Sequence, residues 1–285
     1  MNERVQAMNE TSKTHDRGAS VRRIRFVDQV ADGDAVLLSF QDPSPRYAVL
    51  AGSERREDAT GAGGEELEVV LLPLSVAPQG TQPGFAKWLA KTNGAGAPPP
   101  VYVKLRGVEL MWRPGHAMLQ GDSEQAESLL SAVVEFTHYE RELRRIEDEI
   151  AGSWAELEQD KSLAFDVTPA DLKRSDAVGE RMNRVLQRRI RLARIEPHLY
   201  DPDAGLPAAG QKLGQELRDR ARMDARLETV DAQLEVFEGI YEMSGQRMGE
   251  FRAAQQEHVL EWIIIALLAA ELVLLLVQAL WKPGA

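Results

Sequence analysis

The sequence has 285 residues, of which 44% are hydrophobic and 28% charged, a composition typical of a folded chain with one large domain or two small ones. It contains no cysteine, which excludes disulfides, thiolate zinc sites and a cysteine nucleophile. The formal net charge of −11 disfavours general nucleic-acid binding, because the average field repels phosphates, although a local basic patch can overcome that average.

Residues 1–22 predict a flexible polar tail. They contain no apolar stretch of the kind that a secretory signal needs. Three acids, Glu3, Glu10 and Asp16, argue against a mitochondrial transit peptide, because such peptides are poor in acidic residues.

Residues 23–115 predict a small α+β domain. Short runs rich in Val, Leu and aromatic residues alternate with turns rich in Gly, Pro and Asp, which is the pattern of β-strands and their connections. The stretch "GFAKWLAKT" at 84–92 predicts one short helix among them. Five or six strands are expected, from runs at 24–27, 35–40, 47–52, 67–74, 101–105 and 108–112.

Residues 116–258 predict a region of long helices. A first helix is expected over 122–161, with Asp122 or Ser123 as its N-cap. A second is expected from Thr168 as cap, with Pro169 at its first position, and it should end before Pro197.

The third and last helix is expected to be uninterrupted, because the chain has no proline between Ala208 and Lys282. At 1.5 Å per residue such a helix would be about 100 Å long. Its apolar residues recur at spacings of 3 and 4, which predicts antiparallel, coiled-coil-like packing. These residues, the heptad stripe, are Leu227, Val230, Leu234, Phe237, Tyr241, Met248 and Phe251, with Ser244 in the remaining position.

Residues 259–281 predict one transmembrane anchor at the C-terminal end, which makes this a tail-anchored chain. Eleven Ile, Leu or Val residues between Glu261 and Gln278 favour insertion by about 5 kcal/mol, whereas one central acid costs about 3 kcal/mol. A buried helix of a soluble oligomer is the alternative. The anchor predicts the cytoplasmic (inner) membrane of a bacterium with the bulk of the chain cytoplasmic, or the mitochondrial inner membrane if the chain is eukaryotic.

The acid at the middle of this run, Glu271, predicts self-association. It shares a helical face with Gln278, and a neighbouring face carries the small pair Ala266 and Ala270, which lets two helices approach closely. A hydrogen-bonded partner helix satisfies polar groups that hydrocarbon cannot. A proton or ion pathway is the alternative, and one carboxylate on one span makes a poor transporter.

The stretches "RLETVDAQLEVFEGIYEM" (226–243) and "LEWIIIALLAAELV" (260–273) resemble the C-terminal end of the required-for-meiotic-nuclear-division protein family. Residues 132–150 are similar, more loosely, to an earlier helix of that family. Val230-Asp231 departs from the family's Leu-Asn, and its Pro-x-x-(Phe/Tyr)-Trp element is not recognisable before the last helix. The matching positions are Leu260, Glu261, Trp262, Ile263, Ile264, Ile265 and Glu271.

The resemblance is to a divergent bacterial member of this family. Its mitochondrial relatives are inner-membrane proteins that form large homo-oligomers and support translation by holding ribosomes near the membrane. For this chain the resemblance therefore implies a membrane anchor, a homo-oligomer and, more remotely, a ribosome or RNA partner. For bacterial relatives it implies no defined activity.

The one basic cluster lies at 181–194, where fourteen residues include six arginines. Four of them form one helical stripe that could contact an RNA backbone or anionic lipid headgroups. The alternative is intramolecular pairing with the acids Glu140, Glu147 and Glu149 of the first long helix. The arginine stripe consists of Arg181, Arg184, Arg188 and Arg191.

Catalytic and metal-binding motifs are not found. The five histidines include no HExxH pair, and no phosphate loop, dinucleotide fingerprint or nucleophile elbow is present, so no metal, cofactor or small-molecule substrate is expected. His138, Tyr139 and Glu140 are consecutive, so on a helix they diverge and cannot act on one substrate. We expect them on a solvated helix face.

The sequence thus predicts an α+β domain, long helices and an anchor. The expected function is that of a non-enzymatic scaffold that self-assembles through its coiled-coil and anchor helices. A ribosome or RNA tether is the first alternative, and an enzyme with an unrecognised site in the α+β domain is the second. The residues expected at the anchor and its assembly surface are Glu261, Trp262, Ala266, Ala270, Glu271 and Gln278.

Overall fold

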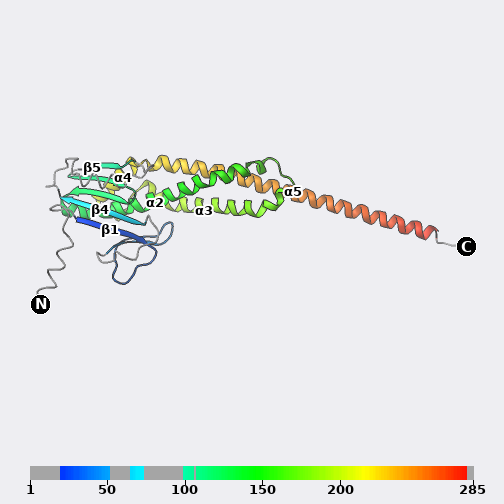
Figure 1. Ribbon diagram of the computed structural model, residues 1–285, viewed down its shortest axis with the longest axis horizontal. Helices are drawn as coiled ribbons and strands as arrows, with labels where there is room; N and C mark the ends of the chain where they lie inside the picture. The colour runs from blue at the N-terminus through cyan, green and yellow to red at the C-terminus, as the bar shows by residue number, and fades with distance from the viewer. Residues whose placement is uncertain (1–19, 52–64, 74–98, 106, 281–285) are drawn as a thin grey trace. The chain divides into compact units, whose positions relative to one another are not determined.

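A computed structural model describes residues 20–51, 65–73, 99–105 and 107–280 (Figure 1). Most of the expected polar tail and the expected short helix at 84–92 lie outside the described residues. An N-terminal sheet followed by long helices confirms the α+β layout.

The sheet has seven strands in the order β2-β3-β1-β4-β7-β6-β5. All neighbours are antiparallel except β4 and β7, which are parallel. The strands are β1 (Ser20–Val27), β2 (Ala35–Phe40), β3 (Arg46–Leu50), β4 (Glu66–Pro73), β5 (Val101–Leu105), β6 (Val108–Arg113) and β7 (His116–Gly121).

The strand that the sequence pattern missed is β7, which occupies the start of the region expected to be helical. It pairs with β6 through a turn in which Gly115 has a φ of 77°, a value that glycine adopts without strain. Its apolar signal is short, because only Ala117 and Leu119 point toward the fully buried face, where they are 1% and 0% exposed. Hydrogen bonding to β4 on one side and β6 on the other holds this segment as a strand, although its own residues do not predict one.

One face of the sheet forms the core against helix α2 (Ser123–Asp160), as Figure 1 shows. Ile24 and Leu67 are directly paired across β1 and β4, and both are 0% exposed. The Trp112 ring meets the Phe136 ring edge-on at 4.9 Å, and its Nε1 donates to Thr137 Oγ1 at 2.8 Å. The alternate side chains on one face of the strands thus pack against one face of α2, and each surface buries the other.

The second expected helix is α3 (Ser175–Tyr200), and it differs from the prediction at both ends. Thr168 does not cap α3, because a 3-10 turn at Asp171–Arg174, with Ala170 at its N-cap position, comes before the helix. The backbone N and Oγ1 of Thr168 both donate to Asp171 Oδ2 instead. At the other end the helix continues through Pro197. Ile195 and Leu199, 0% and 1% exposed, pack on either side of the proline and outweigh the one lost hydrogen bond.

The expected uninterrupted helix is wrong in its first part, because it is broken at Arg222. Helix α4 (Ala208–Arg220) ends there and α5 (Met223–Leu280) begins. Arg222 has a φ of 55°, a left-handed conformation that is uncommon for a residue with a side chain. No glycine or proline marks the break, and the change of direction leaves α4 beside β5. Helix α5 alone is about 87 Å long.

The chain divides into two compact units, and the division falls within α2, α3 and α5. The first unit comprises residues 1–147 and 190–230, so it contains the sheet, and the second comprises 148–189 and 231–285. The sequence pattern instead suggests segments in chain order, at 1–22, 23–115, 116–258 and 259–281.

The heptad stripe of α5 is buried from Leu227 to Met248, where its members, Ser244 included, are at most 4% exposed, and only Phe251 is half-buried. In the second unit the Phe237 ring meets the Trp154 ring of α2 at 4.9 Å, and Asp231 pairs with Arg189 of α3. The three helical segments of this unit therefore lie side by side. Supercoiling of these helices remains a prediction.

Candidate functional site

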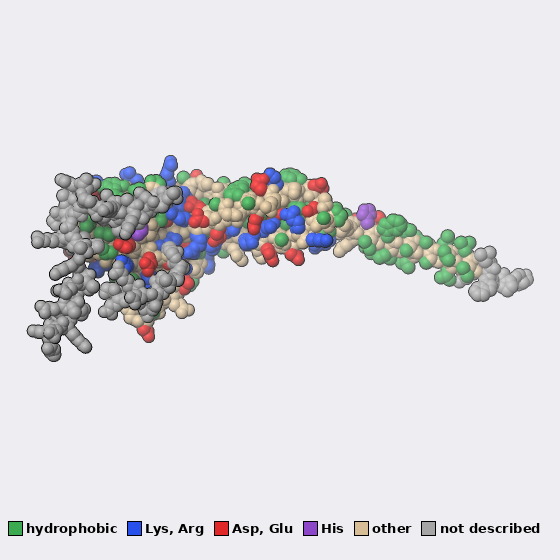
Figure 2. Space-filling view, in the orientation of Figure 1, with side chains coloured by type: hydrophobic (Ala, Val, Ile, Leu, Met, Phe, Trp, Pro, Cys, Tyr) green, Lys and Arg blue, Asp and Glu red, His purple; other side chains and the backbone are tan. Residues whose placement is uncertain are grey.

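The final part of α5 exposes apolar side chains around its whole circumference. The large apolar residues between Val259 and Val277 are 48% to 71% exposed, and an 18-residue window has a mean hydropathy of 2.6 with none of it buried. Figure 2 shows hydrophobic side chains covering this stretch. Among the described residues it is the one helix that is long and apolar enough to cross a membrane.

The residues predicted for the anchor lie on this stretch. Glu261 Oε2 is 3.1 Å from His258 Nδ1 one turn earlier, which makes a polar pair at the start of the apolar run. Trp262 is the most exposed large apolar side chain of the run, at 71%. Ala266, Ala270 and Glu271 are also exposed, and Gln278 lies in the last turn of α5.

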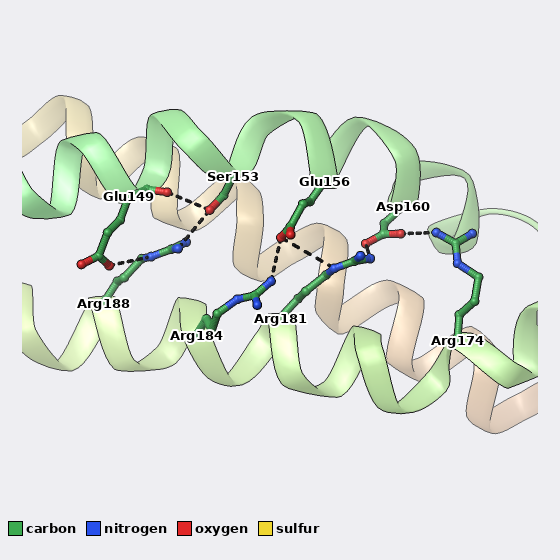
Figure 3. Close-up of polar contacts among 8 residues, drawn as sticks. All are labelled: Glu149, Ser153, Glu156, Asp160, Arg174, Arg181, Arg184 and Arg188. Carbon is green, nitrogen blue, oxygen red and sulfur yellow. Dashed lines mark hydrogen bonds and ion pairs between the residues drawn. The ribbon is translucent and has the colours of Figure 1, made fainter.

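The start of the arginine stripe is tied to one buried carboxylate at the end of α2. Asp160 is 0% exposed, and its two oxygens accept hydrogen bonds from Arg174 and Arg181 (Figure 3). A buried carboxylate is stable only when it is paired and hydrogen-bonded. Arg181 therefore satisfies a charge inside the second unit.

The next two arginines of the stripe also bond to α2 (Figure 3). Arg184 Nη2 donates to Glu156 Oε2 at 2.7 Å. Arg188, whose side chain is 9% exposed, donates to Glu149 Oε2 at 3.1 Å and to Ser153 Oγ at 2.9 Å. These contacts match the intramolecular alternative, and of the predicted acidic partners only Glu149 is one of them.

The rest of the arginine stripe offers no free cation either. Arg191 lies in the first unit, is half-buried and has interaction partners of its own. Contact of the stripe with RNA or lipid headgroups remains a prediction, and the paired acids reduce the positive charge that such contact would use.

The other two predicted acids pair with Arg226, a role that sequence analysis missed. Arg226 donates to both oxygens of Glu147, at 2.8 and 2.6 Å, and to Glu140 Oε1 at 3.0 Å. Burial lowers the pKa of Arg226, but the hydrogen bonds and charges of Glu147 and Glu140 outweigh it, so the pKa is raised. The sequence did contain a signal for this pairing. Glu140 and Glu147 are seven residues apart, which places both acids on one face of α2, opposite the first turn of α5.

The expectation of a solvated face at His138, Tyr139 and Glu140 is wrong. These side chains are 1%, 4% and 2% exposed, because the sheet packs on one side of α2 and other helical segments of the first unit pack on the rest. They diverge, as expected: His138 stacks on Phe40 at 3.9 Å, Tyr139 stacks on a histidine of α3, and Glu140 bonds to an arginine of α5.

No group of three or more His, Asp or Glu side chains within the described part of the chain is arranged to hold a metal ion. No protein-family model matches the chain, and neither the curated proteins nor the solved structures contain a significant relative. The resemblance carried by residues 226–243 and 260–273 therefore stands on those residues alone.

Proposed function

We propose that this chain is a non-enzymatic scaffold, anchored in a membrane by the end of α5 and self-assembling through its helices. The observation that carries the proposal is the exposed apolar run from Val259 to Val277. Nineteen residues at 1.5 Å each are about 28 Å long, close to the hydrocarbon thickness of a bilayer. Soluble proteins rarely expose a continuous apolar surface of this extent.

Self-assembly is proposed from the polar and small residues of the same run. A carboxyl group facing lipid is costly, whereas a second copy of the helix offers a hydrogen-bond partner for Glu271. Ala266 and Ala270 allow the close approach that such a bond needs. The family resemblance supports the same arrangement, a homo-oligomer at a cytoplasmic or mitochondrial inner membrane.

Anchoring is tested by adding charge to the apolar run. Replacing Leu268 and Leu272 together by Lys costs about 6 kcal/mol at the centre of a span, which cancels the apolar gain of about 5 kcal/mol. The double variant should leave the membrane fraction on carbonate extraction, whereas a matched control with Ile at both positions should stay in it. If the unchanged chain is recovered as a soluble monomer without detergent, the proposal fails.

Assembly is tested at the central acid. In mild detergent, Glu271→Leu should give a complex of lower mass by light scattering, with membrane insertion intact. Glu271→Gln, which keeps hydrogen-bonding capacity, should retain the larger mass. An unchanged mass for the Leu variant would remove the assembly role of this side chain.

A membrane tether for ribosomes or RNA is the second candidate. It is kept because Arg184 is 48% exposed although it is paired with Glu156. The swap of Arg184→Glu with Glu156→Arg keeps an ion pair but moves the positive charge to α2. Ribosomal RNA in the native complex that falls in the swap variant would support the tether, whereas a complex free of RNA would support the scaffold alone.

A further inference from the structure

The first unit contains a cavity of about 270 Å³ that includes no residue of the anchor or of the arginine stripe. Its walls come from β2 and the residues after it, from α2, from the end of α3 and from the loop before α4. The apolar part of the wall includes Leu38, Phe40 and Leu206. The polar part consists of Ser39, Gln41, Asp42, Glu135, Tyr139, His198 and Asp203.

The cavity has an excess of negative charge. Glu135 is paired with the buried Arg218, at 3.1 Å. Asp42 is 3.8 Å from Arg194, whose side chain is 57% exposed and therefore screened by solvent. Asp203 Oδ1 accepts only the backbone N of its neighbour Gly205, at 2.7 Å, and no basic side chain in the described part of the chain pairs with it.

One buried polar atom on the cavity wall, Oε2 of Glu135, has no hydrogen-bond partner among the described residues. Oε1 of Glu135 accepts from Arg218 Nη2 at 3.1 Å and from the Asp203 backbone N at 2.9 Å, but its Oε2 is unpartnered, and the residue is 3% exposed. Leaving this carboxylate oxygen unsatisfied costs about 1–3 kcal/mol. The Tyr139 phenol lines the same cavity, and its side chain is 4% exposed.

The phenol of Tyr139 is also held in place. Its ring stacks on the His198 ring at 4.3 Å with an interplanar angle of 7°. Burial raises the pKa of Tyr139, and the charges of Glu135, Asp42 and Asp203 raise it further. The phenol lines the cavity together with these three carboxylates, stays protonated, and can accept a hydrogen bond.

We propose that this cavity binds a small aliphatic ammonium compound of about the size of a diamine. An ammonium group carries three N–H donors and a positive charge, which fit Glu135 Oε2, the Tyr139 oxygen and the Asp203 carboxylate. The methylene chain fits the wall formed by Leu38, Phe40 and Leu206. An anion is repelled, and a metal ion lacks three suitably placed ligands among the described residues.

The probe is putrescine, titrated into the full chain in mild detergent by calorimetry at about 0.15 M salt, where non-specific attraction to a chain of charge −11 is screened. We expect saturable binding and a raised unfolding temperature, because a ligand that binds only the folded state stabilises it. The neutral isostere 1,4-butanediol should give neither. Equal responses to both compounds, or no saturable heat with putrescine, would overturn the proposal.

Two variants locate the site. Asp203→Asn removes one charge but keeps an oxygen for Gly205, and Tyr139→Phe removes only the hydroxyl and keeps the stack on His198. Each should weaken putrescine binding at least tenfold while the unfolding temperature without ligand is unchanged. Asp219→Asn, a remote surface change in α4, is the matched control and should bind as the unchanged chain does. Equal affinity in all three variants would place the ligand elsewhere and contradict the proposal.

Discussion

The two halves of α5 differ both in how their apolar residues are arranged and in how many there are. From Leu227 to Met248 the heptad stripe recurs every three or four positions, and its members are at most 4% exposed. From Val259 to Val277 apolar residues fill nearly every position, and the large ones are 48% to 71% exposed. A helix with one apolar stripe can bury that face against protein, whereas a helix that is apolar on all sides is suited to an apolar solvent. The two halves of this one unbroken helix are therefore suited to two different environments.

The polar stretch at 249–258 separates the two halves. Its residues include Arg252, Gln255, Gln256 and Glu257, and almost all of them are exposed. Ten residues of helix measure about 15 Å. This stretch would keep the packed half of α5 clear of the membrane surface in the proposed arrangement.

The largest difference in unfolding free energy is expected when one side chain in each half of α5 is truncated to Ala. Phe237→Ala removes a ring that is 1% exposed and packs on Trp154, so the free energy of unfolding should fall by about 3–5 kcal/mol. Leu268→Ala removes a side chain that is 61% exposed and should change it by less than about 0.5 kcal/mol. Chemical denaturation in mild detergent, followed by circular dichroism, measures both. Similar losses would mean that the apolar run is packed against protein.

The same contrast should hold for ion pairs along α5. Arg226→Met leaves Glu140, which is 2% exposed, with Arg144 as its remaining partner, and should cost about 3 kcal/mol. Arg247→Met breaks a pair with Glu250 in which both side chains are more than half exposed, and should cost at most about 0.5 kcal/mol. Thermal unfolding of the two variants in parallel makes the comparison. A small effect of the first change would show that Arg144 alone satisfies Glu140.

Acid should weaken the packed part of the chain, because it contains a buried imidazole and the apolar run contains none. Burial lowers the pKa of His138 to about 4, opposed by its hydrogen bond to the Asp42 carbonyl and aided by three nearby arginines. The folded state therefore favours the neutral ring. The stabilisation that this preference adds to the free energy of unfolding is complete above pH 6.5 and is lost as pH falls toward 4. The loss is about 3 kcal/mol.

The control is His138→Phe, which keeps an aromatic ring against Phe40. The difference in unfolding free energy between this variant and the unchanged chain should vary between pH 6.5 and 4, because the other titrating groups are common to both. A constant difference over that range would mean that the imidazole is already charged in the folded protein.

Periodic elements were predictable from the sequence, and contacts between distant segments were not. Helix α2, six of the strands and the apolar run follow from their local patterns. The passage of α3 through Pro197 and the break at Arg222 depend on packing, and the local residues argue for the opposite. For β7, two neighbouring strands compensate for a weak pattern.

The candidate sites show the same limit. Both alternatives for the arginine stripe follow from its spacing. The register between α2 and α3 decides that Arg184 meets Glu156, and the register between α2 and α5 decides that Arg226 meets Glu147. The residues that line the cavity are spread along the sequence from Leu38 to Leu206, so no local motif could predict it. Buried charge networks depend on which helices meet, and amphipathic patterns specify faces without specifying partners.

Among the changes at buried positions, the smallest effect is expected at the one polar position of the heptad stripe. Ser244 is 0% exposed, yet its Oγ donates to the Ile240 carbonyl of its own helix at 2.7 Å. Ser244→Ala leaves no buried group without a partner, because that carbonyl keeps its helical hydrogen bond, so the change in unfolding free energy should stay within about 1 kcal/mol. Ser244→Leu, in contrast, overfills a closed site and should cost about 1–3 kcal/mol. A loss above about 2 kcal/mol for the Ala variant, measured by the same denaturation, would show that the hydroxyl joins two helices and that the stripe is held by more than apolar packing.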